Sequence, residues 1–287
     1  MTATTVLHEQ DHSAAIGRTE TRSEVIEAGR VSALAATLDL ETAPQGGAPL
    51  PQGWHWLFFN PFVRRGELGP DGHPRRGGFL PDVGLPRRMW AGGRLRYLAP
   101  LPIGAEADKT SEILDVASKT GRAGKLVFVT VKHSISTGGV LCIEEEQDIV
   151  YREAPAPGAP KPTPPAAPET SEWSAEFVPD PVLLFRYSAL TSNGHRIHYD
   201  RPYATGEEGY PGLVVHGPLI ATLLQGFAAD CRPDEPLTGF SFRGMAPLFV
   251  DRPFRLEAST GDAGSLDVWA RGPDGELAMK AEASFGS

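Results

Sequence analysis

The sequence has little cysteine and no long hydrophobic run. Cys142 and Cys231 are the two cysteines among 287 residues, and neither lies in a motif for a disulfide or a metal, so we expect two buried free thiols. No apolar segment approaches the ~20 residues that a membrane span needs. Residues 1–17 lack the basic and then apolar pattern of a secretory signal. We therefore expect a cytoplasmic protein without a membrane partner.

The sequence also has fewer basic residues than acidic ones, 27 against 36. The formal net charge of −9 argues against a nucleic-acid partner, for which a basic face is expected. Arginines nevertheless cluster between residues 64 and 96. Such a cluster can bind a small polyanion, for example a nucleotide or a phosphopantetheine carrier. Composition alone favours the alternative, which is a solvated arginine-rich loop.

A proline-rich segment divides the chain into two parts of domain size. Residues 152–170 contain seven prolines and no helical or strand periodicity, which is typical of an extended spacer. We expect a first domain at 23–152, a linker at 153–171 and a second domain at 172–287. Residues 1–22 are polar and weakly patterned, and we expect them to be disordered.

Short alternating runs separated by glycine-containing turns recur in both halves. Four runs occupy residues 93–151 and four occupy 239–285, and the first run of each series carries Ala-Pro-Leu. Residues 218–231 place apolar side chains on one helical stripe behind a proline suited to the first helical position. We predict an α+β fold in which antiparallel sheets curve around buried helices. The first half offers 23–40 and the aromatic run 53–59, but neither repeats the pattern of the later helix.

The stretch from Asn193 to Gly217 holds candidate acid–base residues. His198 has the type of side chain whose ordinary pKa lies near neutral pH, and Asn193 can orient a water through its amide. Gly217 follows His216 at the start of the predicted helix, where unpaired N–H groups suit a developing oxyanion. On spacing alone, a hydrogen-bonded loop histidine and a plain helix start remain open as alternatives.

A metal is the other chemistry that two histidines three residues apart suggest. With His195 and His198 as ligands, a third would have to come from His216, Asp200 or elsewhere. The neighbouring arginines, among them Arg196 and Arg201, would repel a cation. We therefore expect no metal.

The same stretch resembles the MaoC-like dehydratase and hydratase family, whose hot-dog-fold enzymes act on acyl-thioesters. The family motif has the order Asp-x-Asn-Pro-Ile-His, and this chain has Asn-Gly-His-Arg-Ile-His at 193–198, then Tyr-Pro-Gly at 210–212 and His-Gly at 216–217. The segments GWHWLFF, ELGPDGHPRRGGFLP and LPRRMWAGGR resemble the first half of two-domain members, notably mesaconyl-CoA and itaconyl-CoA hydratases. The resemblance covers the chain from about residue 45, and it implies a double hot-dog fold with a catalytic C-terminal half.

The sequence departs from the family motif at three positions. Asn193 replaces the family's aspartate, and an amide cannot exchange a proton as a carboxyl group does. His195 and Arg196 replace its asparagine and proline. The variant nevertheless resembles the pattern of the mesaconyl-type subfamily, which favours an active enzyme.

The resemblance implies reversible hydration of an α,β-unsaturated acyl-CoA without a cofactor. His198 would take a proton from a water held by Asn193, while the Gly217 N–H would stabilise the thioester enolate. A branched C5-dicarboxylic acyl group such as mesaconyl or itaconyl would also need a cation for its carboxylate. The residues expected to bind the substrate are Arg196, Arg201, Tyr210, Gly212, His216, Arg87, Arg88 and Arg94.

Three other functions stay open. A 3-hydroxyacyl-ACP or -CoA dehydratase of fatty-acid or polyketide synthesis would act on a monocarboxylic chain. The missing aspartate suggests a non-catalytic acyl-thioester-binding subunit, and the paired histidines suggest a metal hydrolase. The protein is expected to be a monomer or a homodimer, because a double hot dog can imitate a two-fold dimer within one chain.

Overall fold

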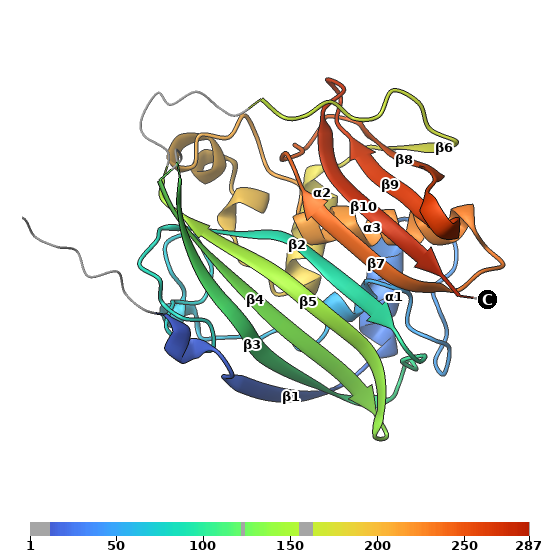
Figure 1. Cartoon of the computed structure of the whole chain (residues 1–287), viewed down its shortest axis with the longest axis horizontal. Coiled ribbons are helices and arrows are strands. Elements are labelled where there is room, and N and C mark those ends of the chain that lie inside the picture. The colour runs from blue at the N-terminus through green and yellow to red at the C-terminus, as the bar shows by residue number, and fades with distance from the viewer. Residues whose placement is uncertain (1–11, 122–123, 155–162, 287) are drawn as a thin grey trace, which may run out of the picture.

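The strands form where buried β-branched residues alternate with less buried ones. In β4 (Gly124–Thr137), Val127, Val129 and Val131 are buried and the residues between them are partly exposed. This computed structural model describes residues 12–121, 124–154 and 163–286. Within these ranges, ten antiparallel strands form one continuous sheet in the order β1-β3-β4-β5-β2-β7-β10-β9-β8-β6 (Figure 1).

Each half of the chain supplies five neighbouring strands. Those of the first half, in sheet order, are β1 (Thr19–Val25), β3 (Glu106–Gly121), β4, β5 (Val140–Arg152) and β2 (Arg87–Tyr97). Those of the second half, in sheet order, are β7 (Leu237–Gly244), β10 (Leu277–Phe285), β9 (Leu266–Arg271), β8 (Phe254–Thr260) and β6 (Trp173–Phe177). The predicted pair of sheets is therefore one sheet, with a hot-dog half on either side of the β2–β7 pairing.

A close backbone approach joins the two halves. Residues 92–96 of β2 pair with residues 239–243 of β7. A Cβ atom at Gly92 would lie 2.4 Å from the carbonyl oxygen of Phe242, a distance that no side chain can occupy. Glycine at this position therefore lets the two edges meet.

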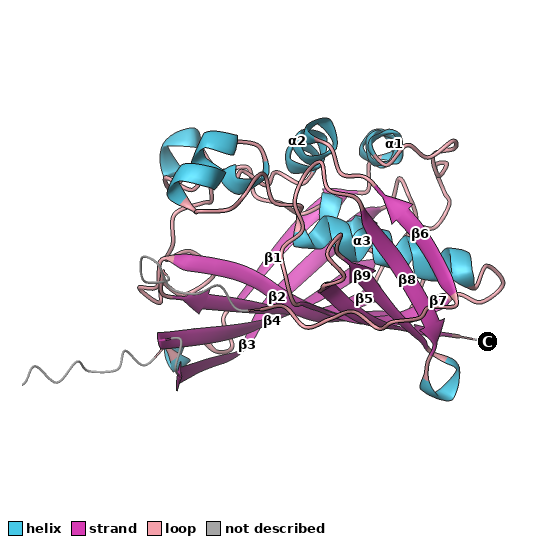
Figure 2. Cartoon of the chain, turned by 90° about the horizontal axis from the view of Figure 1, so that it is seen from above, coloured by secondary structure: helices cyan, strands magenta, loops and turns pink. Residues whose placement is uncertain are grey.

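The three α-helices of the described ranges lie on one face of the sheet (Figure 2). α3 (Gly217–Cys231) packs on β7, β8, β9 and β10, and its buried residues include Leu219, Ile220 and Leu224. α1 (Ala28–Thr37) and α2 (Pro181–Leu190) pack against each other farther from the sheet. In the first half, α1 and the aromatic segment 53–59 join the main apolar core that includes residues of β2, β4 and β5.

The helix and strand predictions are confirmed in outline. The predicted helix 218–231 is α3, and the eight predicted strand runs correspond to β2–β5 and β7–β10. The possible helix at 23–40 is shorter, because residues 23–25 belong to β1. Disorder at 1–22 was wrong for residues 19–22, which pair with β3; residues 1–11 lie outside the described residues.

The predicted linker is partly described, and one of the two cysteines is buried. Of the predicted linker 153–171, residues 155–162 lie outside the described residues, and Ala166 forms a bridge with Glu276. The division into separate domains stays a prediction. Both cysteines are free thiols, but only Cys142 is buried, since Cys231 at the end of α3 is partly exposed. Across the described ranges, no helix has the length and apolar character needed to span a membrane.

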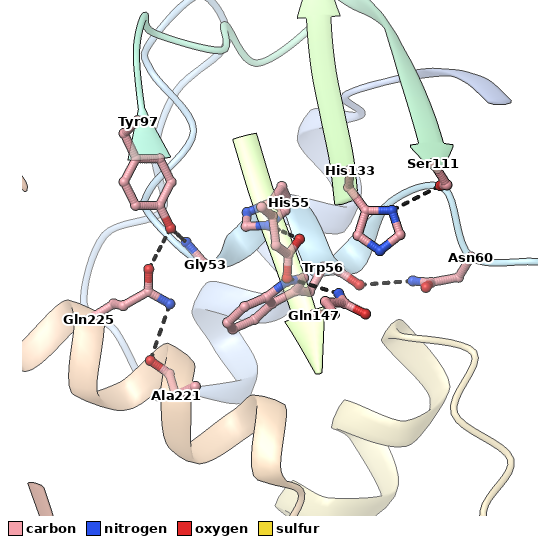
Figure 3. Close-up of polar contacts among 11 residues, drawn as sticks. Gly53, His55, Trp56, Asn60, Tyr97, Ser111, His133, Gln147, Ala221 and Gln225 are labelled. Atoms are coloured by element: carbon pink, nitrogen blue, oxygen red, sulfur yellow. Dashed lines mark hydrogen bonds and ion pairs between the residues drawn. The ribbon is translucent and has the colours of Figure 1, made fainter. Parts of the chain in front are cut away.

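A buried carboxylate fixes the aromatic segment, whose His55 and Trp56 are labelled in Figure 3, to the sheet. Glu145 of β5, with 2% of its side chain exposed, accepts hydrogen bonds from His55 Nε2 at 3.1 Å and from Trp56 Nε1 at 2.8 Å. Burial by itself would raise the pKa of Glu145, but the hydrogen bond from His55 and the electrostatic interactions with His55 and His133 lower that pKa to about 2. The carboxylate therefore stays ionised and anchors residues 55–56.

This anchor predicts a specific loss of stability in acid. The contribution of Glu145 is complete above its unfolded pKa of about 4.5 and is lost as the pH falls toward its folded pKa of about 2. The difference corresponds to about 3 kcal/mol of unfolding free energy. Urea unfolding at pH 6 and pH 3 should show a smaller pH-dependent drop for Glu145→Gln than for the wild type. The matched control is Glu146→Gln, whose carboxylate is 41% exposed; an equal drop in all three proteins would contradict the anchor.

Candidate active site

The loop that leaves α2 presents the motif residues. The chain turns at Ser192, whose φ is +51°, and the Asn193 N–H donates to the carbonyl oxygen of Ser188 at 2.9 Å. The Asn193 Oδ1 accepts the His195 N–H at 3.1 Å, which is the side-chain-to-backbone turn that asparagine favours. With its oxygen engaged, Asn193 keeps its NH₂ group to donate to a water.

Four histidine rings form a row that crosses from the first half into the second. The ring centroids are 4.2 Å apart for His73 and His195, 5.5 Å for His195 and His198, and 3.7 Å for His198 and His216. At one end, His73 Nδ1 lies 3.0 Å from a carboxylate oxygen of Asp71. The structure thus brings the predicted His198 and His216 together with His195, which the sequence offered only as a metal ligand, and adds His73.

His198 is held as a neutral imidazole. It is 7% exposed, and its Nδ1–H donates to the carbonyl oxygen of Val214 at 2.7 Å. Burial lowers its pKa to about 4, although the bond to Val214 partly opposes this shift. A carbonyl oxygen only accepts hydrogen bonds, so Nδ1 carries the proton and Nε2 keeps its lone pair. His198 can therefore accept a proton at Nε2.

His216 and Gly217 form the start of α3, as the sequence predicted. His216 is fully buried and precedes the helix, and its Nε2 lies 2.8 Å from Ser188 Oγ. Burial holds the pKa of His216 well below its ordinary value. Within the described residues, the Gly217 N–H has no acceptor, and it lies at the positive end of the helix dipole. This N–H is available to a developing negative charge.

An aromatic cluster from both halves lies beside this helix start. A Cβ atom at Gly217 would lie 4.0 Å from the Trp90 ring. The centroid of Trp90 is 5.0 Å from those of Trp56 and Phe242. The oxyanion position therefore has an apolar wall, which strengthens electrostatic interactions by excluding water.

The loop at residues 69–75 brings two site residues that sequence reasoning missed, Asp71 and His73. A Cβ atom at Gly72 would lie 1.8 Å from the carbonyl oxygen of Gly194, so the two backbones touch. The Arg196 N–H donates to the carbonyl oxygen of Asp71 at 2.9 Å. The sequence did contain a signal, because Asp71 and His73 flank a glycine within a segment that resembles the family.

Four of the five predicted arginines form ion pairs with acidic side chains, and three of these are Arg196, Arg201 and Arg87. Arg196 donates to Asp200 at 2.8 Å and lies over the Tyr203 ring. Arg201 is exposed and faces Asp251 at 3.4 Å. Arg87 pairs with Glu208 at 3.0 Å. These pairings weaken the case for any of the three as a receptor for a substrate anion.

Arg88 and Arg94 lie on opposite faces of the sheet. Arg88 is directly opposite the buried Tyr151, and it forms no ion pair within the described residues. Arg94 donates to Asp148 at 2.7 Å and to Glu146 on the exposed face. That face lies away from the helices and the histidine row, which argues against the predicted contact of Arg94 with substrate; the contact itself stays a prediction.

The two remaining predicted residues border the site from the loop before α3. Tyr210 packs near Phe249, with ring centroids 6.2 Å apart, and burial raises the pKa of its hydroxyl. Gly212 is buried, and a Cβ atom there would lie 3.9 Å from a guanidinium nitrogen of Arg201. Their predicted contacts with substrate stay predictions.

Asp71, His73 and His195 could also hold a metal ion. Each offers one ligand atom, and these atoms lie within 4.8 Å of one another. This is a different set from the one considered in the sequence, where His195 was combined with His198. Asp71 and His73 already bond to each other, and the positive charges of Arg88 and Arg76 act on His73 and oppose a cation. The absence of a metal stays a prediction.

Known proteins match the chain over nearly its whole length. The profile of the family "Hydroxyacyl-thioester dehydratase type 2" matches residues 53–250. A mesaconyl-C(4)-CoA hydratase of Chloroflexus aurantiacus is 51% identical over 279 residues, which cover 96% of this chain and 98% of the relative.

Solved structures support the fold. A MaoC-like dehydratase of Phytophthora capsici superposes with a TM-score of 0.69 at 14% identity, over 95% of this chain and 96% of that one. A Mycobacterium tuberculosis protein with a double hot-dog fold gives a TM-score of 0.59 at 12% identity, over 94% and 96%. These likenesses confirm the predicted fold. The profile and the 51% identity show that the chain belongs to the hydroxyacyl-thioester dehydratase type 2 family.

Proposed function

We propose that this protein is a hydro-lyase that reversibly hydrates an α,β-unsaturated acyl-CoA, with a branched C5-dicarboxylic acyl group such as mesaconyl as its substrate. The observation that carries the proposal is the neutral, buried His198 beside the free N–H of Gly217 at the start of α3. A relative named mesaconyl-C(4)-CoA hydratase, 51% identical over almost the whole chain, supports the acyl group. The cytoplasmic location and the monomeric or dimeric state stay predictions.

The proposed reaction follows from these two groups. A water held by the Asn193 NH₂ gives a proton to His198 Nε2, and its oxygen forms a bond to the β-carbon of the acyl group. The electron pair of the double bond moves through the α-carbon to the thioester oxygen, which accepts the Gly217 N–H. The α-carbon then takes a proton and the carbonyl group re-forms. The reverse sequence eliminates water.

Arg88 is the arginine best suited to a substrate carboxylate. The largest cause of the lowered pKa values of His73 and His195 is burial, but the charge of Arg88 also contributes to both, so it acts directly on the histidine row. In a mesaconyl thioester the free carboxylate is on the β-carbon, beside the reacting centre. An unpaired guanidinium near the row can therefore bind it by charge-assisted hydrogen bonds.

A panel of thioesters tests the reaction. Purified protein should reduce the conjugated-thioester absorbance of mesaconyl-C4-CoA, and His198→Ala should lower kcat by ~100- to 10,000-fold because proton transfer from water is lost. Asn193→Ala should cost less, since the amide only orients the water. Turnover of crotonyl-CoA or a long-chain enoyl-CoA alone would assign a monocarboxylic substrate. Silence across the panel would contradict the enzyme and favour a thioester-binding protein.

A pair of arginine variants tests the substrate class. Arg88→Met should lower kcat/KM for mesaconyl-C4-CoA by roughly 10- to 100-fold, the effect of losing a hydrogen bond to a charged group, and leave crotonyl-CoA nearly unchanged. Arg94→Met, on the same strand but the opposite face, is the matched control and should change neither value. Equal losses on both substrates for Arg88→Met would argue against a carboxylate contact.

A further inference from the structure

The proposed hydration needs two proton transfers, and the catalytic loop, residues 193–198, supplies one well-placed group, His198. One proton leaves the attacking water and another reaches the α-carbon. Asn193, in the position of the family aspartate, can do neither, because an amide does not exchange a proton near neutral pH. His198 has a backbone carbonyl as its Nδ1 partner. Residues 193–198 therefore contain no second proton-transfer group that a carboxylate orients.

Asp71 and His73 supply that carboxylate from the other half of the chain. In the described part of the chain, Asp71 is the acidic residue hydrogen-bonded to a ring of the four-histidine row, through His73 Nδ1 at 3.0 Å. It also accepts the His73 backbone N–H at 3.0 Å. With Nδ1 bonded to the carboxylate, Nε2 is the nitrogen that can exchange a proton. Both side chains keep solvent access, with 21% of His73 and 32% of Asp71 exposed.

The position of His73 is fixed by contacts with the catalytic loop. Gly72 touches Gly194 through the backbone, and Arg196 donates to the carbonyl oxygens of Asp71 and Pro70. The His73 ring is 4.2 Å from His195, which in turn is 5.5 Å from His198. The dyad therefore belongs to the same site as His198.

We propose that His73, oriented by Asp71, is the second proton-transfer group of the hydratase, replacing the function that Asn193 cannot perform. This inference rests on the proposed function. His198 takes the proton of the attacking water, and the His73 imidazolium gives its Nε2 proton to the α-carbon. The enolate electron pair forms the new C–H bond as the carbonyl re-forms. His198 then releases its proton to solvent and His73 regains one; dehydration reverses both transfers.

The charges around His73 determine how the pair responds to pH. Asp71 favours the imidazolium, whereas burial, Arg88 and Arg76 disfavour it, and together they lower the pKa of His73 below its ordinary value. The neighbouring His195 is neutral at pH 7, since its pKa is about 3. Hydration requires one proton on His73 and none on His198, so activity should fall on both sides of an optimum. Removal of the Asp71 charge should lower the pKa of His73 further. The alkaline limb of the pH profile, where activity falls as His73 loses its proton, should then move to lower pH.

Four variants and a pH profile test this role with mesaconyl-C4-CoA and crotonyl-CoA as probes. His73→Gln should lower kcat by at least ~100-fold with little change in KM. Asp71→Asn should lower kcat less and shift the alkaline limb to lower pH. Asp82→Asn is the matched control, because Asp82 makes the same turn bond, to the Gly84 N–H at 3.1 Å, away from the row. Added imidazole should partly restore His73→Ala, which shows that the variant is folded and lacks a proton carrier.

Each other outcome overturns the proposal. If the wild type turns over the probes and the kcat of His73→Gln stays within about threefold of the wild-type kcat, the proposed function stands but His73 has no part in the proton transfer. A loss confined to KM, or an unchanged alkaline limb in Asp71→Asn, would assign the dyad to binding. Loss of wild-type activity with a chelator, restored by zinc, would make Asp71, His73 and His195 metal ligands instead. No wild-type turnover of either probe would reject the proposed function itself.

Discussion

The pairing of β2 with β7 is the constraint on which the site depends. It joins two five-stranded halves edge to edge, and the absence of a side chain at Gly92 permits it. Two further contacts depend on this alignment: Trp90 of β2 packs at the start of α3, and the loop carrying His73 touches the loop carrying His195. The site is therefore a property of the joined sheet, since neither half contains all of its residues.

Local patterns predicted the parts of the site that local forces determine. The apolar stripe and Pro218 located the start of α3, and with it the free N–H of Gly217. The same reasoning could not find Asp71 and His73, because their loop meets Gly194 across more than a hundred residues of sequence. No local propensity encodes such a contact. The resemblance covered their segment but gave them no role.

Two arginines of β2 show that a single β-bulge can make a prediction from strand alternation wrong. Arg88 and Arg94 are six residues apart, so in a regular strand they would lie on the same face. A bulge between Trp90 and Gly92 adds one residue to β2 and reverses the alternation. Arg88 therefore lies opposite buried Tyr151, while Arg94 meets Asp148 on the exposed face. The sequence of β2 alone does not show this reversal, because the bulge is defined by the pairing of β2 with β5.

The single chain frees the two halves from having to be alike. In a symmetric dimer of one repeated unit, every substitution appears in both copies, so a residue suited to one role must also be tolerated in its mirrored place. Here the loop with Asp71 occurs once and faces the loop with Asn193, which also occurs once. The second half can thus carry Asn193 in place of a carboxylate while the first half supplies the carboxylate of Asp71, and neither residue is repeated in the other half. The fused architecture permits a division of labour that a homodimer cannot adopt.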